Sequence, residues 1–189
     1  MSTEVRKFRI EHFHAPASLG AMNALPEIYR DVVSPIGRLR LIARDGELTG
    51  IWFESGRDAR KGNADLVPGD SPVLSLAKAQ LEEYFRGERR DFDLPLAPAG
   101  TEFQRRVWQR LLGIAYGTTT TYGELAQELG NPNASRAVGL ANGSNPIPIV
   151  IPCHRVIGAN GALTGFGGGL PIKSALLELE RSQRQPRLL

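Results

Sequence analysis

A stiff apolar segment leads into the only cysteine of this 189-residue chain. Residues 145–152 read Asn-Pro-Ile-Pro-Ile-Val-Ile-Pro, and Cys153, His154 and Arg155 follow directly. Each proline fixes one backbone dihedral angle and removes one amide donor, so few conformations are open to the segment. Such a frame can hold the thiol of Cys153 at a fixed place beside His154, which is a potential base.

The lone cysteine leaves two kinds of role for its thiol. A single cysteine cannot form an intramolecular disulfide or a thiolate metal cluster. It is then either a buried inert thiol, the common outcome for a free cysteine, or a chemical group. A thiolate forms beside positive charge or an adjacent base, and His154 and Arg155 supply both, so the local sequence favours a reactive Cys153.

The bulk composition is that of an ordinary globular protein, with 41% hydrophobic and 23% charged residues. No apolar run approaches the roughly 20 residues that a membrane-spanning helix needs, and no apolar signal-peptide stretch follows the N-terminus. A lone cysteine without an export signal predicts a reducing compartment. We therefore expect a cytoplasmic protein with no membrane partner.

Charge is distributed unevenly between the two halves of the chain, although the net charge is only +3. Residues 1–100 hold 14 Lys and Arg against 15 Asp and Glu, whereas residues 101–189 hold 9 against 5. Eight of the nine cations in the second half are arginine. A basic half suits a polyanionic partner, although many basic surfaces are simply solvated.

The first half of the chain predicts a short arm and one small α/β domain. Residues 1–28 show no periodicity, so we expect a poorly ordered arm, and we interpret its His12 and His14 as solvated rather than as a metal site. Residues 29–96 are expected to form the N-terminal α/β domain, a small antiparallel sheet with a helix. Alternation, the Asp45-Gly46 turn signal and helical spacing predict strands at residues 29–33, 39–43, 48–53 and 92–96, a polar loop at 55–71 and a helix at 73–85.

Residues 97–189 are expected to form a second, mostly helical domain after a Pro- and Ala-rich boundary. Two capping boxes, at residues 101–104 and 121–124, mark helix starts. The middle pair of helices, separated by the turn at 130–133, has a helix-turn-helix outline. The glycine-rich residues 161–170 match no phosphate-binding pattern and suit a loop that passes close to a ligand. Helices are predicted at residues 101–115, 121–129, 135–143 and 172–181.

Six motifs occur in order in the second half: TEFQRRVW at 101–108, YGTTTTYGE at 116–124, SRAVGLAN at 135–142, NPIPIVIPCHRVIG at 145–158, LTGFGGGL at 163–170 and LLELE at 176–180. With them the chain resembles the O6-alkylguanine-DNA alkyltransferases, also called methylated-DNA–protein-cysteine methyltransferases. The resemblance covers residues 101–180 nearly without gaps, and Pro-Cys-His-Arg is its most specific part. Residues 29–96 resemble, less specifically, the smaller ribonuclease H-like domain of that family.

The resemblance implies DNA repair by direct reversal, in which an alkyl group moves from O6 of guanine, or O4 of thymine, to Cys153 in a single turnover. It implies that His154 draws the thiol proton through a water while Glu180 orients the imidazole, which is the Cys-His-acid logic of an activated thiol. Spacing alone favours a solvated Glu180. The other catalytic residues implied are Tyr122, which assists the leaving guanine, and Asn145, which ties the helix-turn-helix to the active-site strand.

The resemblance also implies that the target base is extruded from the duplex and that Arg136 fills the space left in the stack. The further DNA contacts implied are Tyr122, Ser135, Ala137 and Asn142. The substrate pocket is implied to include Arg155, Val156, Phe166 and Gly167. The expected partner is double-stranded DNA that contains O6-alkylguanine, bound without a cofactor by a protein that is monomeric when free.

Two other functions remain open at this point. A cysteine hydrolase that uses Cys153, His154 and Glu180 shares the nucleophile but predicts repeated turnover on an ester, amide or thioester. A DNA-binding module without chemistry predicts duplex affinity that does not depend on Cys153. The zinc sites of some members of the resembled family need several cysteines, so no metal site is expected here.

Overall fold

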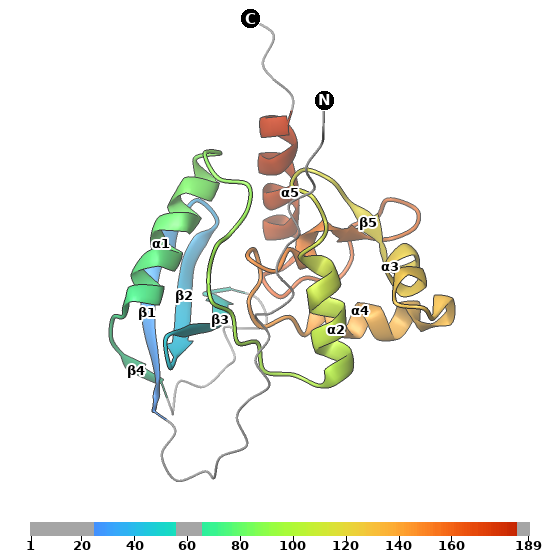
Figure 1. Ribbon diagram of the computed structural model, residues 1–189. Helices are drawn as coiled ribbons and strands as arrows, with labels where there is room; N and C mark the ends of the chain where they lie inside the picture. The colour runs from blue at the N-terminus through green and yellow to red at the C-terminus, as the bar shows by residue number, and fades with distance from the viewer. Residues whose placement is uncertain (1–24, 56–65, 185–189) are drawn as a thin grey trace, which may run out of the picture.

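The computed structural model describes residues 25–55 and 66–184, and Figure 1 shows a sheet covered by one helix beside a group of further helices. His12 and His14 lie outside the described residues. The predicted class, an α/β chain with a small sheet domain and a mostly helical domain, is confirmed. In chain order the elements are β1 (Glu27–Ser34), β2 (Gly37–Arg44), β3 (Glu47–Phe53), β4 (Leu66–Pro68), α1 (Pro72–Phe85), α2 (Glu102–Leu111), β5 (Thr120–Thr121), α3 (Tyr122–Glu128), η3 (Pro132–Ala134), α4 (Ser135–Gly143), η4 (Cys153–Arg155), β6 (Val156–Ile157) and α5 (Leu170–Arg184).

The N-terminal sheet is mixed and has the strand order β3-β2-β1-β4. β2 pairs antiparallel with both β1 and β3, and these confirm the three strands predicted first. The β2–β3 turn is Asp45-Gly46, where φ is 52° and 82°, as a type I′ hairpin requires. β4 pairs parallel with β1, so the expectations of an antiparallel sheet and of only a loop at 55–71 are wrong. β4 has three residues, which are too few to show the alternation of a strand in the sequence. β1 also begins at Glu27, two residues inside the predicted arm.

α1 packs on the sheet (Figure 1) and confirms the helix predicted at 73–85. Ser71 caps its N-terminus, since its side chain accepts a hydrogen bond from Leu74 N. Pro72, which has no amide to satisfy, takes the first helical position. The buried face of the helix consists of Val73, Leu74, Ala77, Gln80, Leu81 and Tyr84.

The chain then crosses to the second domain without the strand predicted at 92–96. Only Leu96 forms a bridge, to Leu48. Leu48 N donates to Pro95 O, and Ala97 N donates to Leu48 O. Because Pro95 has no amide hydrogen, it cannot add a rung to this ladder, and the pairing does not extend to a strand.

In the second domain, α2 is joined to α4 by the ring of Trp108. The predicted capping box is present, with reciprocal hydrogen bonds between Thr101 and Gln104. α2 ends at Leu111, before Gly113, rather than near 115, because glycine disfavours a helix interior. Trp108 is 1% exposed, and its Nε1 donates to a main-chain carbonyl of α4 at 2.8 Å. This bond anchors the helix-turn-helix, formed by α3, η3 and α4, to the rest of the domain.

Two contacts from β3 join the domains, one to the proline-rich segment and one to the glycine-rich loop. Ile51 N on β3 donates to Pro146 O at 2.9 Å. The ring of Phe53, at the end of β3, packs against Phe166 with 5.4 Å between ring centroids. A Cβ on Gly168 would lie 2.9 Å from the Phe53 ring. The glycine-rich loop can therefore approach β3 this closely only because residue 168 has no side chain.

Substituting Gly168→Ala is expected to lower the free energy of unfolding by about 1–3 kcal/mol, as overpacking does, because the new methyl group overlaps the ring of Phe53. Urea denaturation followed by circular dichroism measures the change. Gly143→Ala in α4 is the control, since a Cβ there meets nothing within 4 Å and alanine favours a helix. Equal stability of the two variants would contradict the packing of Phe53 on this loop.

Candidate active site

The segment before Cys153 is held in one conformation by its own polar groups. Asn145 Nδ2 donates to Ile151 O at 2.8 Å, and Asn145 Oδ1 accepts from Ile147 N at 3.0 Å. Ile149 is fully buried and has a φ of 75°, a region in which strain costs of order 1–3 kcal/mol. Such strain persists only where the surrounding structure fixes the backbone, and here it lies four residues before the thiol.

Cys153 and His154 open the short helix η4, and both are buried, with exposures of 3% and 0%. Asn142 Nδ2 on α4 donates to Cys153 O at 3.4 Å. His154 Nε2 lies 2.7 Å from Glu180 Oε1. Because an ionised carboxylate only accepts hydrogen bonds, Nε2 carries a proton, and Nδ1 keeps its lone pair when the ring is neutral. Nδ1 is buried and has no hydrogen-bond partner within the described residues.

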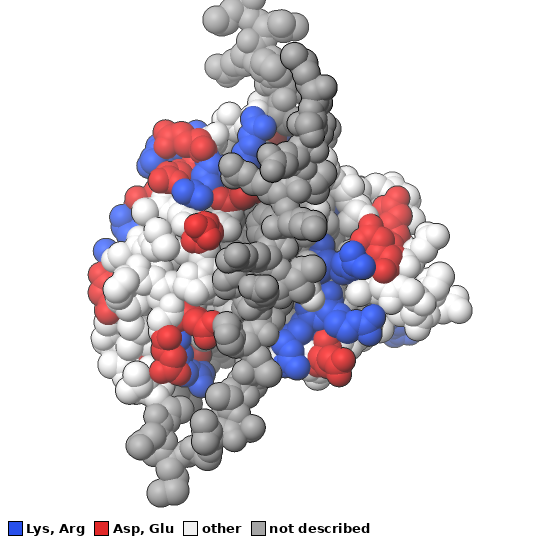
Figure 2. Space-filling model, in the orientation of Figure 1, with Lys and Arg blue, Asp and Glu red and all other residues white. Residues whose placement is uncertain are grey.

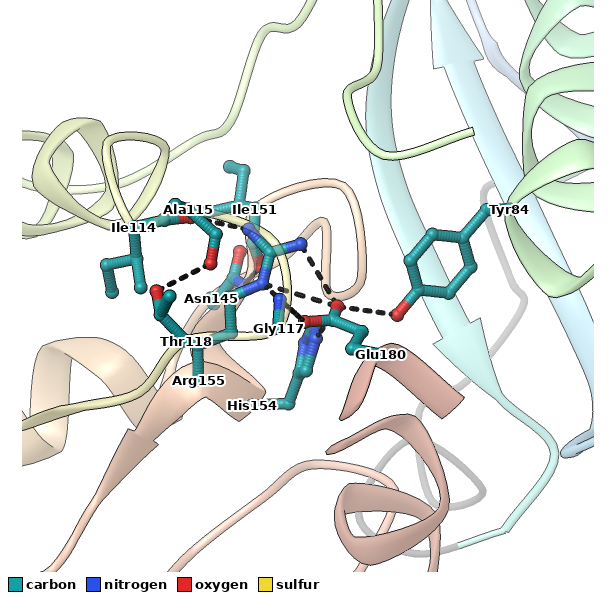
Figure 3. A network of polar contacts seen from close by, with 10 residues as sticks. All are labelled: Tyr84, Ile114, Ala115, Gly117, Thr118, Asn145, Ile151, His154, Arg155 and Glu180. Carbon is teal, nitrogen blue, oxygen red and sulfur yellow. Dashed lines mark hydrogen bonds and ion pairs between the residues drawn. The ribbon is translucent and has the colours of Figure 1, made fainter. Parts of the chain in front are cut away.

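Glu180 on α5 is the centre of the polar network in Figure 3. Burial raises the pKa of Glu180, but the hydrogen bonds from His154 and Arg155 and the positive charge of Arg155 outweigh burial and bring the pKa to about 2. Glu180 is therefore an anion at neutral pH, although its side chain is completely buried. Its carboxylate accepts from His154 Nε2 (2.7 Å), the Tyr84 hydroxyl (2.8 Å), Gly117 N (2.9 Å), and Arg155 Nε (2.9 Å) and Nη2 (3.0 Å).

Burial is the largest influence on His154 and lowers the pKa of its imidazole, while Glu180 opposes this shift. The positive charges of Arg155 and Lys173 lower the pKa further. Arg155 also pairs with the Glu180 carboxylate, so that carboxylate does not need a protonated His154 to balance its charge. His154 is thus a neutral imidazole at neutral pH, which is the form that can accept a proton.

A buried lysine forms a second charged centre near the thiol. Lys173 on α5 is 0% exposed, and its Nζ donates to Val156 O at 2.6 Å and to Thr164 O at 2.7 Å. Burial lowers the pKa of Lys173, and the charge of a Cys153 thiolate raises it again. Lys173 forms no ion pair with a carboxylate in the described part of the chain, so a thiolate at Cys153 is the negative charge that its ammonium faces.

The glycine-rich loop meets both η4 and the start of α3. Phe166 lies edge-on to His154, with 6.5 Å between ring centroids, and Gly167 follows it, half-buried. Tyr122 is the first residue of α3, and its hydroxyl oxygen accepts from Thr164 Oγ1 at 3.1 Å. The glycine-rich loop thus links two predicted site residues, since Thr164 contacts Tyr122 and Phe166 contacts His154.

The start of α4 exposes most of the predicted DNA contacts. Ser135, Arg136 and Ala137 are exposed there, and Arg136 has no hydrogen-bond or ion-pair partner among the residues that the structure describes. Asn142, by contrast, is 2% exposed and donates to the Cys153 carbonyl. It is therefore not available to DNA in this structure, because its side chain links α4 to the backbone of the cysteine.

Figure 2 shows how charge is distributed on one face of the molecule. Blue and red side chains alternate over α1 and the sheet, whereas arginine predominates over α2, which carries Arg105, Arg106 and Arg110. This distribution agrees with the excess of arginine in residues 101–189.

Two predicted site residues, Asn142 and Arg155, lie in a different place from the one expected, and Lys173 and Tyr84 were not predicted. Arg155, expected to line the substrate pocket, lies in the Glu180 network instead. Lys173 was not predicted, although Lys173, Leu176 and Glu180 are spaced i, i+3 and i+7 and share the buried face of α5. Two charged residues in an apolar stripe are a usable signal. Tyr84 has no such signal, because it reaches the site from the other domain.

Membrane-spanning helices, metal-binding clusters and disulfides are absent from residues 25–55 and 66–184. None of the helices within these ranges combines the length and the apolar character that a membrane-spanning segment requires. Nor do these residues form a cluster of three or more His, Cys, Asp or Glu that could hold a metal ion. Cys153 is not in a disulfide.

Two family matches together span most of the chain. Residues 28–98 match the ribonuclease-like domain of 6-O-methylguanine DNA methyltransferase. Residues 102–182 match the DNA binding domain of 6-O-methylguanine DNA methyltransferase. The two matches meet in the proline-containing stretch between Leu96 and α2.

Individual relatives align with the chain over nearly their whole length. A methylated-DNA–protein-cysteine methyltransferase of Methanosarcina mazei is 60% identical over 158 residues, which cover 82% of this chain and 97% of that protein. The Mycobacterium tuberculosis protein of the same name is 51% identical, covering 82% of this chain and 93% of its own. The crystal structure of Mycobacterium tuberculosis OGT in complex with DNA superposes with a TM-score of 0.77, at 50% identity, over 82% of this chain and 94% of that one.

Glu180 is expected to make stability depend on acid pH. Its pKa is about 2 in the folded protein against an ordinary 4.5, so its contribution is complete above pH 4.5 and is lost as the pH falls towards 2. With about 1.4 kcal/mol for each pKa unit, the loss is about 3 kcal/mol. Urea denaturation at a series of pH values should give a flatter dependence for Glu180→Gln than for the parent. Glu178→Gln, which removes an exposed carboxylate from the same helix, should keep the parent's dependence of unfolding free energy on pH. If Glu180→Gln keeps it as well, the pKa of Glu180 is not lowered in the folded protein.

Proposed function

The chain belongs to the 6-O-methylguanine DNA methyltransferase family, and we propose that it repairs DNA by transferring an alkyl group from O6 of guanine to its own Cys153. By family it is a methylated-DNA–protein-cysteine methyltransferase, and DNA is its macromolecular partner. One observation carries the choice of acceptor. The only cysteine of the chain is followed by a buried histidine whose Nε2 is held by a buried carboxylate, in the domain that also carries the helix-turn-helix.

Activation of the thiol uses the free nitrogen of His154. Because Nε2 is engaged by Glu180, Nδ1 receives the thiol proton, and the carboxylate stabilises the imidazolium that forms. The ammonium of Lys173 adds a second positive charge that favours the thiolate. The result is a sulfur anion at Cys153, buried among groups that stabilise its charge.

The thiolate then attacks the alkyl carbon. An S–C bond forms as the O6–C bond breaks, and the electron pair of the broken bond stays with guanine, which leaves as an anion or, once protonated, as the neutral base. Tyr122 supports this departure with a hydrogen bond, since its oxygen accepts from Thr164 and its own hydrogen remains available. The product is a thioether. Water does not remove the alkyl group from its sulfur, so each protein molecule reacts once.

Access to the buried thiol requires that the base leaves the duplex, which costs a few kcal/mol. Arg136, exposed at the start of α4, fills the space that the base vacates. Ser135 and Ala137 flank it and lie against the DNA. The half-buried backbone around Gly167 lies close to the extruded base, as a glycine-rich loop permits.

The proposed substrate is double-stranded DNA with O6-alkylguanine, and O4-alkylthymine reacts by the same chemistry. The protein acts as a monomer when free and in the cytoplasm, where its thiol stays reduced. The α/β domain ends near residue 96, and the alkyltransferase domain begins at 97. A cysteine hydrolase would instead release its product and turn over repeatedly, which a thioether does not allow.

The parent protein, mixed with a duplex that contains O6-methylguanine, is expected to gain one methyl group per molecule on the peptide that holds Cys153. Intact and peptide mass spectrometry measure this gain. Cys153→Ser should gain none while binding the duplex with nearly unchanged affinity, since the thiol lies below the DNA-binding surface. Methylation at another residue, or repeated turnover, would contradict the proposal.

Arg136→Ala is expected to slow methyl transfer from duplex DNA by about tenfold or more, because extrusion then loses a contribution on the order of 1.4 kcal/mol or more. Transfer from a single strand, which has no stack to fill, should change little. Single-turnover rates on both substrates measure the difference. Arg181→Ala, which removes an exposed arginine from α5, is the matched control. If Arg136→Ala slows transfer from both substrates equally, Arg136 does not fill the space left in the stack.

A further inference from the structure

One donor of the Glu180 network comes from the other domain. Tyr84 lies in the last turn of α1, 96 residues before Glu180, and its hydroxyl donates to Glu180 Oε1 at 2.8 Å. His154 Nε2 binds this same oxygen at 2.7 Å. Figure 3 shows the Tyr84 ring reaching the carboxylate from the right, whereas Arg155 approaches it from the left.

The Tyr84 hydroxyl is held in place as a donor. Burial and the negative charge of Glu180 both raise the pKa of Tyr84, so the phenol keeps its proton. The ring is fully buried and lies against the rings of Phe85, Phe92 and Tyr116, with centroid distances of 5.4, 5.5 and 5.9 Å. These contacts fix the direction of the O–H group towards Glu180.

We propose that Tyr84 is a positioning residue whose hydroxyl competes with His154 for one carboxylate oxygen and so sets how strongly His154 holds a proton. A carboxylate oxygen that accepts a second hydrogen bond attracts an imidazolium less. With Tyr84 bound, His154 stays a neutral base that can accept the thiol proton. The link to alkyl transfer rests on the proposed function, and it gives the N-terminal domain a direct part in the chemistry.

Glu180 and His154 face other polar groups besides Tyr84. Glu180 also faces Arg155, the amide of Gly117 and, electrostatically, Tyr116, while His154 also faces Lys173. Tyr116 offers a matched control. Its ring touches that of Tyr84, but its buried hydroxyl has no hydrogen-bond partner in the described part of the chain.

The test compares Tyr84→Phe and Tyr116→Phe with the parent, using nitrogen NMR of the imidazole rings across pH. The chain has three histidines, so the His154 signals are readily assigned. Tyr84→Phe is expected to raise the pKa of His154 by about half a unit or more, and Tyr116→Phe to leave it unchanged. Because neutral His154 is the base, the acid limb of the rate of Cys153 methylation should move to higher pH by the same amount.

Loss of stability in Tyr84→Phe without a change in the His154 titration or in the pH–rate profile would overturn the proposal, because a purely structural role affects only stability. An equal shift in Tyr116→Phe would overturn it as well. Failure of the parent to take up a methyl group would instead refute the proposed function, and the NMR titration would still decide the role of Tyr84.

A second measurement does not depend on the folding of Tyr84→Phe. In the Tyr116→Phe background, replacement of the remaining tyrosines by 3-fluorotyrosine makes the residue 84 hydroxyl a stronger donor to Glu180. The pKa of His154 should then fall, opposite to the change in Tyr84→Phe. An unchanged or raised pKa would contradict the competition between the two donors.

Discussion

The buried carboxylate of Glu180 sets the strongest constraint on how the two domains pack. An isolated buried charge costs many kcal/mol unless it is paired and hydrogen-bonded, so the fold must bring donors to it from wherever the chain can supply them. Those donors come from α1, the loop after α2, and η4. The need to satisfy one carboxylate therefore fixes the orientation of His154 and the position of one domain against the other.

The same helix carries the second buried charge. Lys173 stands two turns before Glu180 on the inward face of α5 and binds two main-chain carbonyls, those of Val156 and Thr164. These carbonyls belong to the strand after the cysteine and to the glycine-rich loop, so the ammonium links both to α5. Charges interact more strongly where water is excluded. The ammonium of Lys173 therefore favours the thiolate of Cys153, and the carboxylate of Glu180 favours the imidazolium of His154.

The N-terminal domain touches each part of this arrangement. Ile51 binds the carbonyl of Pro146 in the proline-rich segment, Phe53 packs under the glycine-rich loop, and Tyr84 reaches Glu180. These contacts extend from the end of the sheet and the end of its covering helix. A domain whose sequence contains neither cysteine nor histidine thus contacts the segment before Cys153, the glycine-rich loop and the carboxylate that binds His154.

Features with local causes could be predicted from the sequence: the capping boxes, the Asp45-Gly46 hairpin, and the helices at 73–85 and 135–143. The remaining features arise only in the folded chain, because they depend on residues far apart in the sequence. The parallel pairing of β4, the inward turn of Asn142 and the placement of Arg155 follow no local pattern. A buried charge is stable only when distant donors converge on it, and no window of sequence contains both the charge and all of its donors.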